Sequence, residues 1–196
     1  MKKNKKVITG TPSVDQIENE LKWEKYKNRY HSVLRSTIYT LLVVAAVAVL
    51  VATLWLPVLQ IYGSSMTPTL QDGEIVFSMK TSEFEPGDII AFYYNNKILV
   101  KRVIGEAGDW IDIKEDGTVY VNHVAIDEPY LVEKALGECD IELPYQVPDE
   151  KVFVMGDHRS TSVDSRSTAV GSVAQEQIVG RILFRVWPIG RLGSVK

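Results

Sequence analysis

The stretch IYTLLVVAAVAVLVATLWLPVL, residues 38–59, contains no charged side chain and lies in a longer uncharged interval between Arg35 and Asp72. As a helix, its 22 residues extend about 33 Å, enough to cross the hydrocarbon core of a bilayer. A cleaved signal peptide would lie nearer the N-terminus, and a buried core helix rarely lacks charge over such a length. We therefore expect a retained membrane anchor.

Charge is distributed unevenly on the two sides of this stretch. Residues 1–36 contain nine Lys and Arg against four Asp and Glu, and the rest of the chain contains thirteen against twenty-one. The positive-inside rule predicts a cytoplasmic N-terminus and an extracytoplasmic body. An acidic body also argues against nucleic acid as a partner, because phosphate binding needs a basic face. The basic residues before the anchor are Lys2, Lys3, Lys5, Lys6, Lys22, Lys25, Lys27, Arg29 and Arg35.

Three regions follow from this division: a tail over residues 1–36, an anchor over 37–59 and a body over 60–196. Within the tail, residues 15–34 place apolar side chains at three- and four-residue spacings, which indicates an amphipathic helix near the bilayer. A solvated, half-ordered leader is the alternative. The spaced residues are Ile17, Leu21, Trp23, Tyr26, Tyr30 and Leu34.

The body is expected to be mainly β, because short apolar and β-branched runs alternate with turn residues. Asp116-Gly117 predicts a short hairpin between two of these runs. Residues 127–150 contain three prolines and a glycine, so we expect a looser excursion there. The expected strands are Glu74–Met79, Asp88–Tyr94, Ile98–Ile104, Trp110–Ile113, Val119–Val121, Val152–Met155 and Ile178–Val186.

Cys139 is the only cysteine, so no disulfide can form within the chain. No Cys/His cluster has zinc-like spacing, and we expect neither a metal nor a cofactor. The acidic neighbours Glu138 and Asp140 disfavour the thiolate that a nucleophile needs.

Three polar clusters are the candidates for chemistry. The first, residues 63–70 (GSSMTPTL), follows the anchor directly, where a nucleophile would meet substrates emerging from the bilayer. The second, residues 98–105 (ILVKRVIG), places two cations in a run typical of a buried strand. Desolvation there would lower the pKa of Lys101 and make its amine a base. The third, residues 155–166 (MGDHRSTSVDSR), is rich in hydrogen-bonding side chains that can pair with one another.

Each cluster also has a plain structural interpretation. A serine between glycine and proline is usually turn chemistry, two cations on an edge strand can both reach solvent, and a dense polar run is usually a solvated loop.

Together the clusters resemble the type I signal peptidase family. The motifs are Ser-Met-x-Pro-Thr-Leu at residues 65–70, Gly-Asp-Ile at 87–89, Lys-Arg-Val-Ile-Gly with a following Gly-Asp at 101–109, and Gly-Asp-x-Arg with Ser-x-Asp-Ser-Arg at 156–166. A single anchor and a short domain are similar to the Gram-positive branch. The resemblance implies an antiparallel β-sheet catalytic domain behind one N-terminal transmembrane helix.

By this resemblance, Ser65 is the nucleophile, Lys101 the general base and Ser162 a hydroxyl that orients the lysine amine. The implied supporting residues are Asp157, Arg159, Asp164 and Arg166, and apolar residues expected to line the substrate pockets are Ile61, Leu70, Val76 and Val100.

Two positions depart from the family pattern. His158 stands where members often have asparagine, but with Lys101 present a second base would be redundant. Gly63 stands where some members have a serine that helps to bind the oxyanion, which leaves the Ser65 N–H as one donor and the second donor open.

The implied function is a membrane serine endopeptidase that cleaves secretory preproteins after small residues such as alanine, at the cell membrane and without a cofactor. A self-cleaving SOS-type repressor has similar Ser/Lys chemistry but needs a DNA-binding domain where the anchor stands. A membrane-tethered β domain that only binds partners, and a sortase-like enzyme using Cys139 with His123 or His158 and Arg159, are the further alternatives.

Overall fold

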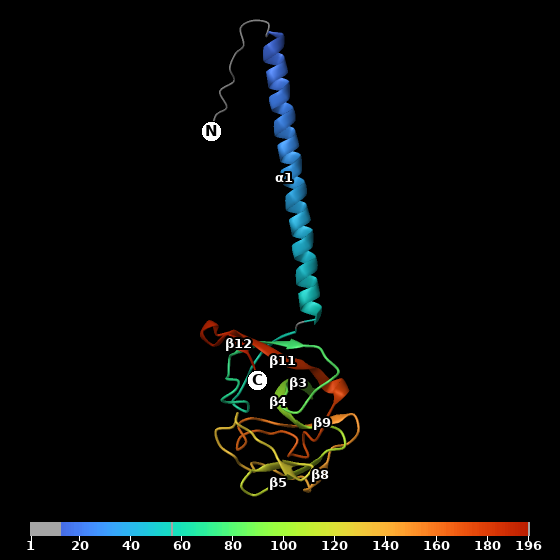
Figure 1. The fold of residues 1–196 in the computed structure, drawn as a ribbon, viewed down its shortest axis with the longest axis vertical. Helices are drawn as coiled ribbons and strands as arrows, with labels where there is room; N and C mark the ends of the chain where they lie inside the picture. The colour runs from blue at the N-terminus through green and yellow to red at the C-terminus, as the bar shows by residue number, and fades with distance from the viewer. Residues whose placement is uncertain (1–12, 56, 196) are drawn as a thin grey trace. The chain divides into compact units, whose positions relative to one another are not determined.

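A computed structural model describes residues 13–55 and 57–195 (Figure 1). The chain divides into two compact units between Val51 and Ala52, and each unit is described separately. The lysines at positions 2, 3, 5 and 6 of the expected basic tail lie outside the described residues.

From Val14 onward the first unit is helical, as part of one long helix, α1 (Val14–Trp55), whose last four residues belong to the second unit. Its start is set by a capping box, in which Ser13 Oγ accepts from the Gln16 N–H and Gln16 Oε1 accepts from the Ser13 N–H. The tail segment 15–34 is helical, as predicted, and it is continuous with the apolar segment. The helix is long and apolar enough to cross a membrane.

The helix ends earlier than the predicted anchor. Pro57 cannot continue a helix because it lacks an N–H and crowds the residue before it. The predicted anchor included Val58 and Leu59. These residues belong instead to strand β1 (Val58–Gln60). Strand β1 pairs antiparallel with β2 (Ile75–Met79). Backbone pairing therefore begins where the helical hydrogen bonds stop.

The second unit contains two antiparallel sheets. The larger has the order β1-β2-β11-β3-β4-β9-β10, with β12 paired to β11, and the smaller has the order β7-β6-β5-β8. The remaining bounds are β3 (Ile89–Tyr94), β4 (Lys97–Gly105), β5 (Trp110–Ile113), β6 (Val119–Val121), β7 (Val124–Ala125), β8 (Tyr145–Gln146), β9 (Lys151–Met155), β10 (Val173–Ala174), β11 (Ile178–Trp187) and β12 (Gly193–Ser194), with short 3-10 helices η1 (Gln175–Gln177) and η2 (Ile189–Arg191).

The predicted mainly β body is confirmed, and each of the seven predicted runs contains a strand. The predicted hairpin joins β5 to β6, and Gly117 at φ +81° supplies the left-handed residue of its turn. The strands that the sequence analysis missed have two or three residues each, too few for an alternating pattern to be detected. Residues 127–150 contain only β8, which agrees with the expected excursion.

A hydrophobic cluster holds the loop that carries Ser65. Ile61, Met66 and Leu70 pack with residues of β2, β3 and β11, and Leu70 is completely buried. Full burial of such a side chain contributes about 1.5–3 kcal/mol. The Leu70 N–H also donates to the Met66 carbonyl at 2.9 Å, which closes the loop on itself. Apolar residues on both sides of Ser65 therefore fix the position of its backbone.

Candidate active site

Ser65 of the first cluster and Lys101 of the second are in contact, although they are 36 positions apart in the sequence. Lys101 lies in β4, where it pairs with Ile90 of β3, and Ser65 lies in the loop between β1 and β2. The Lys101 Nζ donates a hydrogen bond to the Ser65 Oγ at 2.7 Å. A hydroxyl and an amine at this distance have the geometry for direct proton transfer.

Burial changes the acid–base chemistry of Lys101. Its side chain is 3% exposed, and this desolvation lowers the pKa of the amine from 10.5 to about 8. Asp164 and Asp157 oppose the change, while the positive charge of Arg166 adds to it. At pH 7 about one tenth of the amine is then neutral, compared with roughly 0.03% of an unperturbed lysine. Lys101 is therefore able to act as a base near neutral pH.

The backbone before Ser65 is held by Asp72. The Gly63 N–H donates to Asp72 Oδ1 at 2.7 Å, and Gly63 adopts a φ of +86°, a conformation that favours glycine. Because this amide is already engaged by a carboxylate, Gly63 offers no hydrogen-bond donor to an oxyanion. Ser64 is exposed on the same loop, and its carbonyl accepts from both the N–H and the hydroxyl of Thr67.

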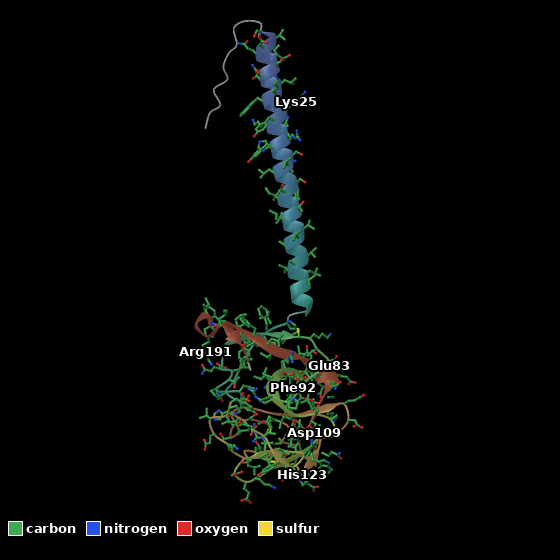
Figure 2. All side chains as sticks on the ribbon, in the orientation of Figure 1. Lys25, Glu83, Phe92, Asp109, His123 and Arg191 are labelled. Carbon is green, nitrogen blue, oxygen red and sulfur yellow. The ribbon has the colours of Figure 1, made fainter. Side chains whose placement is uncertain are left out.

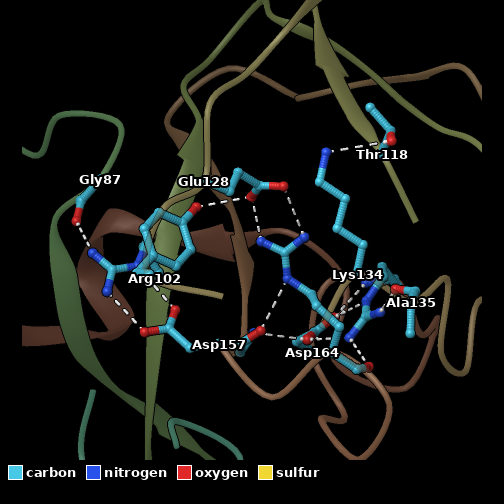
Figure 3. Close-up of polar contacts among 12 residues, drawn as sticks. Gly87, Arg102, Thr118, Glu128, Lys134, Ala135, Asp157 and Asp164 are labelled. Carbon is cyan, nitrogen blue, oxygen red and sulfur yellow. Dashed lines mark hydrogen bonds and ion pairs between the residues drawn. The ribbon is translucent and has the colours of Figure 1, made fainter. Parts of the chain in front are cut away.

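Three buried ion pairs organise the third cluster (Figure 3). Asp164 and Arg166 pair within it, with Oδ2 and Nη2 2.8 Å apart. Burial alone would raise the pKa of Asp164, but hydrogen bonds and charge from Arg166 outweigh burial and hold that pKa below its usual value. Arg166 Nη2 also donates to the Arg159 and Ser162 carbonyls. The expectation that these residues pair with one another is confirmed for Asp164 and Arg166.

The other two charged residues of the cluster pair outside it. Arg159 forms a buried ion pair with Glu128 of the excursion. Asp157 accepts from Arg102 Nε and Nη2 at 2.9 and 2.7 Å, and from the Thr69 hydroxyl. Figure 3 shows Arg102 between Gly87 and Asp157, with the Glu128 carboxylate on the neighbouring arginine. One strand, β4, thus supplies both the lysine at Ser65 and the cation at Asp157.

Arg102 and Glu128 were missed by the sequence analysis. The apolar run at residues 98–105 placed Arg102 in a strand. The presence of two cations in this run was the sequence feature that could have indicated its burial. Its guanidinium is 3.9 Å from the centre of the Tyr130 ring, whose hydroxyl donates to Glu128. Burial raises the pKa of Tyr130, which keeps that donor protonated. No local pattern marked Glu128, because its role depends on Arg159, 31 residues away.

Ser162 lies beside Ser65, but its hydroxyl makes no hydrogen bond with the Lys101 amine. Its Oγ is buried without a hydrogen-bond partner among residues 13–55 and 57–195. A Cβ on Gly156 would lie 2.2 Å from this oxygen and 2.5 Å from the Ser65 carbonyl, so only glycine fits there. Gly156 therefore lets Ser162 approach the backbone of Ser65.

The side chains of the two candidate histidines and of the cysteine were the other possible catalytic groups. His158 Nδ1 lies 3.1 Å from the Thr67 hydroxyl, and the His158 N–H donates to the Ser65 carbonyl at 3.0 Å. His123, labelled in Figure 2, lies in the turn between β6 and β7 of the smaller sheet. Burial raises the pKa of the half-buried Cys139 thiol, with Asp140 and Asp164 adding to the effect. The thiolate is thus disfavoured, as expected.

An apolar groove of about 750 Å³ leads to Ser65 and Lys101. Residues 59–63 with Met66 line one side, and residues 96–100 line the other. Ile61 and Val100, two of the four residues expected to line the substrate pockets, are among the residues that line the groove. Leu70 and Val76 do not; both are fully buried in the core, Val76 because the alternation of β2 turns it inward. The prediction that those two residues line a pocket was wrong.

Comparison with known proteins places the chain in a family. The family model described as "Signal peptidase, peptidase S26" matches residues 34–187. A signal peptidase I from Bacillus amyloliquefaciens is 34% identical over 187 residues, covering 90% of this chain and 100% of the relative. A signal peptidase IB from Staphylococcus aureus is 40% identical over 148 residues, covering 65% of this chain and 76% of the relative.

A crystal structure of a signal peptidase I from Enterococcus faecalis V583 is 30% identical, with a TM-score of 0.44 over 50% of this chain and 96% of the other. The family match spans more than half of the chain, from the apolar helix to the end of β11. The chain belongs to the signal peptidases of the peptidase S26 family.

Proposed function

We propose that this protein is a membrane-bound serine endopeptidase that removes N-terminal signal peptides from secreted preproteins, with Ser65 as nucleophile and Lys101 as general base. One observation carries the assignment: a buried lysine amine with a lowered pKa lies 2.7 Å from the Ser65 hydroxyl oxygen. A domain that only bound partners would not need this arrangement, since burying an amine is costly without a functional return.

The reaction would proceed through an acyl-enzyme. The neutral Lys101 amine takes the proton of the Ser65 hydroxyl as its oxygen attacks the scissile carbonyl. The resulting ammonium gives that proton to the leaving nitrogen as the C–N bond breaks, which releases the mature protein and leaves the signal peptide esterified to Ser65. Water, deprotonated by Lys101, then hydrolyses the ester and regenerates the hydroxyl.

The third cluster would support this chemistry. A Lys101 ammonium that has taken the serine proton needs a new acceptor, and the unpartnered Ser162 Oγ is buried beside Ser65. The negative charges of Asp157 and Asp164 stabilise the ammonium through space. Their own pairing with arginines fixes their positions, while Arg159 and Glu128 hold the excursion against the cluster.

The signal peptide would bind in the groove as an extended strand, with small side chains such as alanine next to the scissile bond. The apolar lining by Ile61, Met66 and Val100 supports an apolar substrate segment. Exposed backbone along a groove wall allows strand addition, in which main-chain hydrogen bonds supply affinity and pockets supply specificity.

The N-terminus would be cytoplasmic and the catalytic unit extracytoplasmic, in the cell membrane. The excess of cations before the helix supports this orientation, because loops rich in Lys and Arg remain inside. Protease added to intact spheroplasts should remove the catalytic unit and spare residues 1–36. Protection of the catalytic unit would reverse the orientation.

The activity test uses the purified full chain and a model preprotein, with N-terminal sequencing of the product. Ser65→Ala and Lys101→Met should each abolish cleavage, and the double variant should lose little more than either, because the two residues act as a unit. Methionine keeps the apolar stem and removes only the amine. Lys114→Met, at an exposed lysine of the second unit, is the matched control. Full activity of a folded Lys101→Met variant would remove lysine from the mechanism.

A further inference from the structure

A second cavity lies between the Ser65 loop, the third polar cluster and the excursion of residues 127–150. It has a volume of about 190 Å³, the space of roughly six water molecules at about 30 Å³ each. Thr67 and Pro68 form one wall, His158 and Ser160 form another, and the excursion closes it with Val132, Glu133 and Ala135. None of these residues lines the apolar groove, so the cavity is a separate site.

The cavity is adjacent to the nucleophile. Thr67 is two residues from Ser65 in the chain, and the His158 N–H donates to the Ser65 carbonyl at 3.0 Å. An extended peptide advances about 3.3 Å per residue, so one or two residues beyond the reacting carbonyl cover about 3–7 Å. The cavity is thus within reach of the substrate residues nearest to the scissile bond.

The excursion wall is held in place by buried groups. Arg166 Nη1 donates to the Leu136 carbonyl, and Gly117 packs so closely on Ala135 that a Cβ there would lie 2.4 Å from its nitrogen. The buried pair of Glu128 with Arg159 fastens the start of the excursion. Figure 3 shows the Lys134 amine reaching the Thr118 hydroxyl, and the neighbouring Ala135 carbonyl accepts from Arg166 Nη1. A cavity with a fixed wall presents a defined surface to a ligand.

The polar groups of the cavity favour a positive or hydrogen-bonding side chain. Glu133 is exposed, whereas Asp157 at the cavity floor is already paired with Arg102 and Thr69. The single Thr67 hydroxyl proton is donated to the Ser64 carbonyl, so His158 Nδ1 must be the donor to the Thr67 oxygen. Two carboxylates line the cavity. Asp157 is paired with Arg102, whereas Glu133 is exposed, so Glu133 carries the negative charge that a ligand can meet.

We propose that this cavity binds one of the first two residues after the scissile bond, on the leaving-amine side, and that Glu133 makes it prefer lysine or arginine there. The inference rests on the proposed function. The apolar groove takes the signal peptide, which stays on Ser65 as the acyl group, so the mature segment must leave on another side of the nucleophile. The cavity is a hollow next to the Ser65 loop that shares no lining residue with the groove of the acyl segment.

The test measures kcat/KM of the full chain for preproteins that differ only at the first or the second residue after the cleavage site, with lysine, glutamine or glutamate there. An exposed pair of opposite charges changes affinity by about two- to fivefold, so lysine should exceed glutamate by about three- to tenfold at one of the two positions. Glu133→Lys should reverse this preference and Glu133→Gln should reduce it.

The control is Glu142→Lys, which makes the same charge change at an exposed residue of the excursion outside the cavity. It should keep the wild-type preference. An equal change in the Glu142 and Glu133 variants would overturn the inference, because a general field would then explain the selectivity. Equal cleavage of all preproteins would overturn the inference alone, and cleavage of none would overturn the proposed function with it.

Discussion

The buried amine of Lys101 predicts an unusual stability profile, and Lys101→Met is the perturbation that isolates it. Because burial lowers the pKa of the amine from 10.5 to about 8, the protonated form is disfavoured in the folded protein. Each pKa unit corresponds to about 1.4 kcal/mol, so the wild type bears a cost of about 3 kcal/mol at pH 7. Methionine bears no such cost, although it also loses the hydrogen bond to Ser65.

The direction with pH follows from proton counting. Below pH 8 both the folded and the unfolded chain are protonated at Lys101, and the full cost is present. Between pH 8 and 10.5 the unfolded chain keeps a proton that the folded chain has lost, so wild-type stability rises with pH. The cost remaining at pH 10 is about 1 kcal/mol. The stability difference between Lys101→Met and wild type should therefore shift by about 2–3 kcal/mol from pH 7 to pH 10 in favour of the wild type.

Urea unfolding of the full chain in detergent, followed by tryptophan fluorescence, measures this difference. Other titrating groups are common to both proteins and cancel. A difference that stays constant within about 0.5 kcal/mol across this range would refute the lowered pKa. Activity supplies a second readout: kcat/KM should rise about tenfold per pH unit below pH 8 and level off above it. A profile that levels off near pH 6.5 would indicate a histidine instead.

The remaining predictions concern the residues around the pair. Arg102→Met should destabilise the catalytic unit by about 3–5 kcal/mol in urea unfolding, because it leaves the buried Asp157 carboxylate without its cation. Lys114→Met should leave the urea midpoint nearly unchanged, and equal losses in the two variants would contradict the role of burial. Cys139→Ala and His123→Asn should keep cleavage within about twofold of wild type, since a Ser/Lys pair uses neither a thiol nor an imidazole; a loss of about a thousandfold in either folded variant would assign it a catalytic role.

The predictions from sequence were most accurate where the signal is local. The runs at 110–113 and 119–121 became β5 and β6 with the predicted bounds, because alternation and an Asp-Gly turn are properties of neighbouring residues. The predicted anchor ended at Leu59, four residues after the helix ends at Trp55. Val58 and Leu59 are apolar enough to continue a transmembrane helix, and only their pairing with β2 assigns them to a strand.

The predictions of site residues were also accurate only where the signal did not depend on tertiary contacts. The resemblance of the motifs to a known family selected Ser65 and Lys101, and the structure places these two side chains in contact. Leu70 and Val76 were wrongly assigned to a pocket, because an apolar side chain near a motif can face either the groove or the core. The partner of Arg159 was not foreseen, since Glu128 belongs to an irregular segment whose path no periodicity predicts.

The sequence by itself determined the apolar helix, the charge step across it and the succession of strands, because each depends on composition or on spacing along the chain, and the resemblance of its motifs to a known family pointed to the serine and the lysine. Only the tertiary structure decided that the Lys101 amine lies against the Ser65 hydroxyl in a desolvated site. It also decided that a second cavity, lined by Glu133 and by Thr67 and Pro68 of the Ser65 loop, lies beside that loop. The physical reason is that burial, and the electrostatics that follow from it, arise from which distant segments pack together.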